Sequence, residues 1–306
     1  MPTAYVYTDL GGPEHESFAD LPRPVPGPGQ LLIAVRAAGV NPVDWKRRTG
    51  YRPIGASQLP LPAVFGSEAA GVVEEIGEGV TGFAVGDEVF GTPDTGGYAQ
   101  FTLLPAAVTA HKPAGVSWAD AASLAVAAAT AYDALDQLAL PAGSTLLVNG
   151  VGGGVGVAAA QIARHRGLTV IGTASPAKKD FVESLGAVHV PYGPGVDDRV
   201  RGAAPDGVDA VFDLVGGASL REVAPLAADP ARLVSGADRT VAELGGSPVL
   251  RKREASVLDA VAQLVVEGAL DPFVTRTFPL AEAAQALRTV EDGHAQGKIV
   301  IEVVSG

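Results

Sequence analysis

The sequence contains no cysteine, which excludes disulfide bonds, a thiolate nucleophile and any zinc site built from cysteine ligands. The lack of disulfides favours a cytoplasmic protein. The first residues, MPTAYVYTDLGG, have neither a basic start nor an apolar core, so we expect no signal peptide. No apolar run approaches the roughly 20 residues that a membrane span requires, and we therefore expect no membrane as a partner.

Positive charge is also scarce. The 306 residues include 22 lysines and arginines against 34 aspartates and glutamates, which gives a net charge of -12. This balance argues against nucleic acid as a partner, although a local basic pocket can still hold an anionic ligand. Hydrophobic residues make up 47% of the chain, which is enough apolar material for two cores.

The first third of the chain is typical of β structure. Segments 31–40, 69–80, 85–91 and 98–104 are rich in strand-forming residues, and glycine and proline separate them at close intervals. This spacing predicts a small barrel or sandwich.

The pattern changes near residue 117. Ser117, with Asp120 three residues later, predicts the start of a long helix. Apolar strands then alternate with helical segments, and this alternation implies a parallel sheet with right-handed crossovers. The predicted strands are TLLVNG, TVIGTAS, VHVPYG, VDAVFDLVG and ARLVSGA, and the clearest helices cover 154–166, 176–185, 218–228 and 254–268.

The tail from residue 272 to 306 contains a strand-like PFVTRTFPL, a helix over 281–292 and a last strand, KIVIEVV. It is too small for a core of its own, so we expect it to return to the first domain. The predicted fold class is therefore α/β. One domain comprises residues 1–117 with 268–306, and the other, built on a doubly wound parallel sheet, comprises residues 118–267.

A glycine-rich stretch, NGVGGGVG, follows the first apolar strand of the second domain and opens a helix. That context is the one in which backbone amides and a helix N-terminus bind the diphosphate of a dinucleotide. The glycines follow a GxxGxxG spacing at Gly150, Gly153 and Gly156. A plain tight turn is the alternative, but it does not explain so many glycines, each of which costs about 1 kcal/mol relative to alanine in a helix. We predict a cofactor-binding loop of Gly150, Val151, Gly152, Gly153, Gly154, Val155 and Gly156.

The end of the next strand selects the cofactor. Sites for NAD usually carry an Asp or Glu about 20 residues after the glycines. Here the sequence reads GTASPAKKD, with no carboxylate at the strand end but with Ser175, Lys178 and Lys179. Because a hydroxyl and a cation suit a 2′-phosphate, we predict NADPH, with Ser175 and Lys179 as ligands. The alternative is that the lysines form a solvated helix start.

Several segments, taken in order, resemble the zinc-independent medium-chain dehydrogenases/reductases, in particular the quinone oxidoreductase branch. They are AAGVNPVDWKRRTGY (37–51), FGSEAAGVVEEIGEGVTGFAVGDEVFG (65–91), ATAYDAL (129–135), NGVGGGVG (149–156), DLVGG (213–217) and HAQGKIVIEV (294–303). The resemblance implies a GroES-like barrel completed by the tail, an inserted Rossmann domain, and an active site in the cleft between them.

A catalytic zinc ion is not expected. FGSEAAG lacks the histidine of the GHE motif that zinc-type relatives carry. The histidines, which are His15, His111, His165, His189 and His294, show no ligand spacing.

Without a Lewis acid, reduction of a quinone or an activated C=C bond is easier than oxidation of a simple alcohol. Hydride leaves the nicotinamide for an electrophilic carbon, and hydrogen-bond donors hold the charge that builds on a conjugated oxygen. The resemblance implies that Asn41, Asp44 and Tyr51 surround that oxygen, with Asn41 also near the nicotinamide ribose. The alternatives are that Asp44 caps a helix and that Tyr51 only walls the site.

The resemblance also implies further cofactor contacts. Thr130 would lie near the nicotinamide, and Tyr192 would border the adenosine phosphate. Positions at the carboxyl ends of strands, where open α/β sheets bind ligands, add Val215, Gly216, Ser235, Gly236 and Ala237. Lys298 either reaches the cofactor or is a solvated lysine. The run Arg251, Lys252 and Arg253 is most simply interpreted as a solvated helix start.

The sequence thus predicts an NADPH-dependent, zinc-free reductase that acts on a small-molecule quinone or enone. An enoyl-thioester reductase of secondary or fatty-acid metabolism is a second hypothesis, although we locate no basic groove for a phosphorylated carrier. A non-catalytic NADPH-binding protein is a third. Relatives are commonly homodimers through the Rossmann sheet, and the same is expected here.

Overall fold

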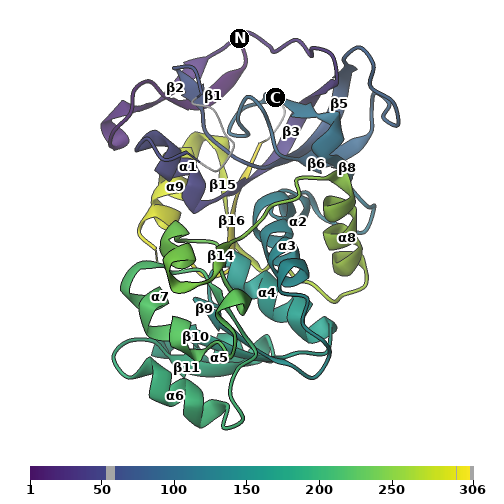
Figure 1. Cartoon of the computed structure of the whole chain (residues 1–306). Helices are drawn as coiled ribbons and strands as arrows, with labels where there is room; N and C mark the ends of the chain where they lie inside the picture. The colour runs from purple at the N-terminus through teal and green to yellow at the C-terminus, as the bar shows by residue number, and fades with distance from the viewer. Residues whose placement is uncertain (53–58, 294, 304–306) are drawn as a thin grey trace. The chain divides into compact units, whose positions relative to one another are not determined.

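The computed structural model describes residues 1–52, 59–293 and 295–303. The chain forms two compact units (Figure 1). Unit 1 comprises Met1–Val126, Arg253–Val266 and Phe273–Gly306, and unit 2 comprises Ala127–Lys252 and Glu267–Pro272. No helix in the described ranges is long and apolar enough to cross a membrane.

Unit 1 is built on a seven-stranded sheet in the order β15-β16-β3-β5-β6-β8, with β7 also paired to β3. A three-stranded sheet, in the order β2-β1-β4, lies in the same unit. The strands are β1 (Thr3–Tyr7), β2 (Glu16–Asp20), β3 (Gln30–Val40), β4 (Ala63–Val64), β5 (Ala69–Ile76), β6 (Glu88–Gly91), β7 (Phe101–Pro105), β8 (Thr109–His111), β15 (Val274–Pro279) and β16 (Lys298–Glu302). The β-rich first third and the GroES-like fold predicted from the sequence are confirmed.

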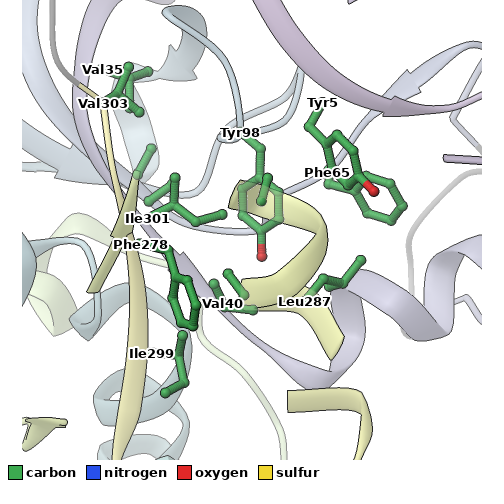
Figure 2. Packing of buried hydrophobic residues seen from close by; sticks show 14 of the residues in the cluster. Tyr5, Val35, Val40, Phe65, Tyr98, Phe278, Leu287, Ile299, Ile301 and Val303 are labelled. Carbon is green, nitrogen blue, oxygen red and sulfur yellow. The ribbon is translucent and has the colours of Figure 1, made fainter. Parts of the chain in front are cut away.

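The C-terminal tail completes unit 1. Strand β16 pairs antiparallel with β3, and β15 pairs parallel with β16. Figure 2 shows Phe278, Ile299 and Ile301 of the tail in one hydrophobic cluster with Val40 and Tyr98 of the N-terminal part. A single core therefore holds two segments that are far apart in the sequence.

Four α-helices of unit 1 are α1 (Pro42–Arg48), α2 (Trp118–Ala121), α8 (Ala255–Val266) and α9 (Ala283–Glu291). Ser117 caps α2, as the sequence predicts, and its side chain accepts a hydrogen bond from the Asp120 N–H at 3.0 Å. Helix α8 lies in unit 1, whereas the sequence analysis placed residues 118–267 in the second domain. The reason is that α8 contacts β8 and the short helical turn Ala106–Val108, both of which belong to unit 1.

Unit 2 contains a six-stranded parallel sheet in the order β11-β10-β9-β12-β13-β14. Its strands are β9 (Thr145–Asn149), β10 (Thr169–Ala174), β11 (Val188–Pro191), β12 (Ala210–Asp213), β13 (Leu233–Ser235) and β14 (Ser247–Pro248). The helices are α3 (Ala129–Leu138), α4 (Gly154–His165), α5 (Lys179–Ser184), α6 (Val196–Ala203) and α7 (Gly217–Val223). This strand order is that of a Rossmann fold. From β9 the chain adds strands first on one side of the sheet and then, from β12, on the other, so the topological switch point lies between β9 and β12.

The long helix predicted from Ser117 is interrupted. A π-helical turn, Leu124–Ala128, separates α2 from α3. Within this turn, the backbone N–H of Val126 donates to the Glu68 carboxylate at 2.7 Å. Helical composition alone does not predict this contact, because Glu68 lies far away in the sequence.

Candidate functional site

The glycine-rich loop leaves β9 through a sharp turn at Gly150, whose φ of 89° favours glycine. Its N–H donates to the Thr173 hydroxyl at 2.9 Å, and the Val151 N–H donates to the Thr173 carbonyl at 3.0 Å. The Thr173 hydroxyl in turn donates to Asn149 at 2.6 Å. The end of β10 thus fixes the start of the loop.

Two glycines of this loop have different steric requirements. A Cβ on Gly156 would lie 2.6 Å from the Gly150 carbonyl oxygen, so only glycine lets α4 pack this closely against the loop. A Cβ on Gly153 would have no protein atom within 4 Å. The space beside the N-terminus of α4 is therefore open. Gly153 provides no side-chain cap, and the first N–H groups of a helix lack intrahelical partners, so these amides suit an anion.

A buried carboxylate organises the next strand ends. Asp213, which is fully buried at the end of β12, accepts hydrogen bonds from the Asn149 side chain at 2.8 Å and the Ser235 hydroxyl at 2.6 Å. It also accepts from the N–H groups of Val215 at 3.2 Å and Gly216 at 3.1 Å. The loops after β12 and β13, which carry predicted cofactor residues, are thus held by one side chain.

Sequence reasoning missed Asn149, Thr173 and Asp213 as site residues. The signal was present, because each of these polar residues lies at or next to the last position of an otherwise apolar strand. A buried polar residue at a carboxyl end needs partners, and its neighbours at the same edge of the sheet provide them.

Asp238 connects the same two loops. Its carboxylate accepts from the Gly217 N–H at 2.8 Å and from the Thr240 N–H at 2.9 Å. These backbone hydrogen bonds hold the pKa of Asp238 below its ordinary value. Ala237 is fixed nearby, because its N–H donates to the Ser235 hydroxyl at 3.2 Å.

The two adjacent lysines after β10 lie in different surroundings. The Lys178 ammonium is 3.4 Å from the Gly152 carbonyl, and burial lowers the pKa of Lys178. Lys179, which the sequence analysis selected, is 61% exposed and lies 3.9 Å from Glu183. The structure therefore places Lys178, rather than Lys179, against the glycine-rich loop. Ser175 occupies the N-cap position of the short helical turn Pro176–Lys178 at the end of β10, and its side chain makes no capping hydrogen bond.

Thr130 and Arg251 form a cluster that the sequence did not predict. The Arg251 guanidinium donates to the Thr130 hydroxyl at 2.7 Å and to the buried carboxylate of Asp133 at 2.9 Å. The interpretation of Arg251 as part of a solvated helix start is wrong. Helix α8 begins only at Ala255, and Arg251 pairs with Asp133, which is far away in the sequence.

Asn41 in unit 1 is held at both ends of its amide. Its Nδ2 donates to Glu68 at 2.8 Å, and its Oδ1 accepts from the Lys298 ammonium at 2.6 Å. Lys298 and Glu68 also pair directly at 2.7 Å, with side-chain exposures of 4% and 0%. The Lys298 ammonium is thus buried and engaged by the protein. The alternative of a solvated lysine is wrong, and Glu68 is a member of this cluster that the sequence analysis did not name.

Asp44 is buried beside this cluster. Its carboxylate accepts from the Asn41 backbone N–H and the Tyr98 hydroxyl, both at 2.9 Å, and from the Ser67 hydroxyl at 2.5 Å. Burial raises the pKa of Asp44. This arrangement is the capping-box interaction at the start of α1, and it agrees with the capping alternative for Asp44.

Tyr51 follows α1 and is 45% exposed. Its N–H donates to the Lys46 carbonyl at 2.9 Å, which ties the chain to the end of the helix. Within the described residues, no three His, Asp or Glu side chains are placed to share a metal ion. His294 lies outside the described residues.

Two family models match the chain. The model described as an alcohol dehydrogenase GroES-like domain matches residues 27–114, and the one described as a zinc-binding dehydrogenase matches residues 185–301. Among curated proteins, the human quinone oxidoreductase is 30% identical over 96% of this chain and 95% of its own length. The NADPH-dependent alkenal/one oxidoreductase of Arabidopsis thaliana is 32% identical over 97% of this chain and 78% of its own length.

A polyketide synthase, GfsB of Streptomyces halstedii, is 38% identical over 90% of this chain, but this match spans only 5% of that much longer protein. Among solved structures, the quinone oxidoreductase of Coxiella burnetii superimposes with a TM-score of 0.88 at 30% identity, covering 99% of both chains. A mycobacterial protein solved with NADPH gives a TM-score of 0.87 at 30% identity, covering 99% of this chain and 100% of that one.

The parallel sheet with its glycine-rich loop, the GroES-like unit and these similarities lead to one assignment: the chain belongs to the medium-chain dehydrogenases/reductases, and it is of the quinone oxidoreductase type.

Proposed function

We propose that the protein is an NADPH-dependent, zinc-free reductase that transfers hydride to a quinone or to the activated C=C bond of an α,β-unsaturated carbonyl compound. The observation that carries this proposal is the glycine-rich loop, with open space beside Gly153 and a close approach at Gly156, in a Rossmann sheet. Those are the features that a dinucleotide diphosphate needs.

The preference for NADPH rests on the end of β10. No carboxylate is present there to accept the ribose hydroxyls. Ser175 follows the strand directly, and the Lys178 ammonium lies beside the glycine-rich loop. The names of relatives agree with this choice, since one is an NADPH-dependent alkenal/one oxidoreductase and another was solved with NADPH. We therefore propose Lys178 as the main cationic ligand of the 2′-phosphate, with Ser175 and Tyr192 beside it and Lys179 in a lesser role.

Each unit would contribute differently to the reaction. When bound, NADPH supplies the hydride. The amides at the start of α4 hold its diphosphate, and the loops fixed by Asp213 present Val215, Gly216, Ser235, Gly236 and Ala237 to it. In unit 1, the exposed Tyr51 donates a hydrogen bond to the substrate oxygen on which charge develops, and solvent water provides the proton. Asp44 and Lys298 act by holding Asn41 and α1 in place.

The second candidate is an enoyl-thioester reductase. It is favoured by the 38% identity to a segment of a polyketide synthase. The chemistry at the C=C bond is the same, but the activating group is a thioester. Homodimer formation, a cytoplasmic location and the non-catalytic alternative remain predictions.

One assay separates these candidates. Consumption of NADPH and of NADH is followed against a panel of quinones, enones and enoyl thioesters. We expect turnover with NADPH and with a quinone or an enone. Activity confined to enoyl thioesters would favour the second candidate. Tight NADPH binding without turnover of any acceptor would favour the non-catalytic alternative.

A further inference from the structure

The loop that carries Tyr192 is rich in proline and glycine, and the Val196 N–H closes it by donating to the Gly193 carbonyl at 3.0 Å. It reads PYGPG over residues 191–195, and Gly193 and Gly195 have φ values of 97° and 75°. Its two prolines have no N–H to donate. Tyr192 itself is 61% exposed, and its backbone N–H is tied to the Ala174 carbonyl at the end of β10 at 3.1 Å.

Arg199 holds this loop from the side of α6, which lies next to β11 (Figure 1). Its Nε donates to the Pro191 carbonyl at 3.0 Å, its Nη2 to the Gly193 carbonyl at 2.9 Å and its Nη1 to the Pro194 carbonyl at 2.9 Å. One planar guanidinium thus binds carbonyl groups on both sides of Tyr192. Such a fork fixes direction as well as distance, which a lysine ammonium does not.

Arg199 forms no salt bridge with any residue that the structure describes. In the described part of the chain, no carboxylate lies within ion-pair distance of it, although Asp197 and Asp198 precede it directly. Those two acids pair instead with Arg201, at 2.8 and 3.2 Å. The two arginines of helix α6 therefore have different partners. Arg201 pairs with the acids of its own helix, and Arg199 donates to the carbonyl groups of the loop.

We propose that Arg199 is a positioning residue for cofactor specificity: by clamping the carbonyls of residues 191, 193 and 194, it sets Tyr192 against the phosphate-bearing adenosine end of NADPH. This inference rests on the proposed function, namely that unit 2 binds NADPH. The arginine does not touch the cofactor, and it acts through the position of Tyr192.

The test compares Arg199→Met, Arg199→Lys and, as a matched control on the same helix, Arg201→Met. Dissociation constants for NADPH and NADH are measured by fluorescence titration of each full-length variant. We expect both Arg199 variants to weaken NADPH binding by about tenfold while NADH binding changes by less than about twofold. Arg201→Met loses the same charge and should keep the wild-type ratio. Arg199→Lys keeps the charge, so a wild-type ratio in this variant would overturn the positioning role.

A double-mutant cycle with Tyr192→Ala tests the route of the effect. If Arg199 acts through Tyr192, Arg199→Met should not weaken NADPH binding further when Tyr192 is already alanine. A full additional loss, or an equal loss in Arg201→Met, would contradict the proposal. The wild-type titration separates a failure of the proposed NADPH binding from a failure of the role given to Arg199. A wild-type protein with no preference for NADPH contradicts the proposed function, whereas a wild-type preference that Arg199→Met leaves intact contradicts this inference alone.

Discussion

Replacement of Lys298 by methionine should strongly destabilise unit 1. The Lys298 ammonium is almost fully buried and contacts Glu68 at 2.7 Å and Asn41 at 2.6 Å. Methionine has a similar stem but no charge, so the Glu68 carboxylate would stay buried without its cation. Breaking a buried pair in this way costs about 3–5 kcal/mol. We expect the free energy of unfolding of Lys298→Met to fall by that amount.

The double variant Glu68→Gln/Lys298→Met removes both charges and tests the cause. It should be more stable than Lys298→Met by about 1–3 kcal/mol, because no uncompensated charge remains. Urea unfolding followed by tryptophan fluorescence measures this directly, since both tryptophans, Trp45 and Trp118, lie in unit 1. Lys179→Met is the control. Its side chain is 61% exposed, and the change should stay within about 0.5 kcal/mol. If the Lys298→Met protein were as stable as wild type, the stabilising role of the buried Lys298–Glu68 pair would be refuted.

Other predictions follow from the glycine-rich loop, from Asp238 and from the proposal that the reaction needs no zinc ion. Gly153→Ala, whose Cβ meets no protein atom, should keep stability within about 0.5 kcal/mol but weaken NADPH binding at least about fivefold, whereas Gly156→Ala should cost about 1–3 kcal/mol of stability in urea unfolding. Equal behaviour of the two variants would contradict the loop geometry. The pKa of Asp238 is lowered in the folded state, so its stabilisation is fully present above the ordinary value of 3.8 and is lost as the pH falls further. Thermal melts of Asp238→Asn should therefore differ from wild type at neutral pH and converge with it in acid, and a difference that does not depend on pH would count against this. Incubation with EDTA should leave the NADPH-dependent activity unchanged, and a loss that zinc restores would overturn the zinc-free reaction.

The sequence predicts the fold of unit 2 well because its signals are local. The predicted strands are short, mostly apolar runs, and the glycines at 150, 153 and 156 lie between one such run and a helix. Strand β14, Ser247–Pro248, has no such run and was not predicted. Helix α6 was missed because it is short and mostly polar, so it lacks a clear apolar period.

The details of the site depend instead on contacts between distant residues. Glu68 accepts a hydrogen bond from Val126 in the π-helical turn and pairs with Lys298, and the sequence around Glu68 predicts neither contact. The same holds for Arg251, which looks solvated in its own segment but pairs with Asp133 on α3. The choice between Lys178 and Lys179 depends on the direction of two adjacent side chains at the start of a helix, which the sequence does not specify.

The central claim is that the backbone amides after Asn149 bind the diphosphate of NADPH. A crystal structure of the protein soaked with NADPH tests this most directly. The claim predicts diphosphate oxygens within hydrogen-bond distance of the amides at the start of α4, with the 2′-phosphate beside Ser175 and Lys178. An empty loop at saturating NADPH, or a cofactor bound elsewhere in the chain, would contradict it.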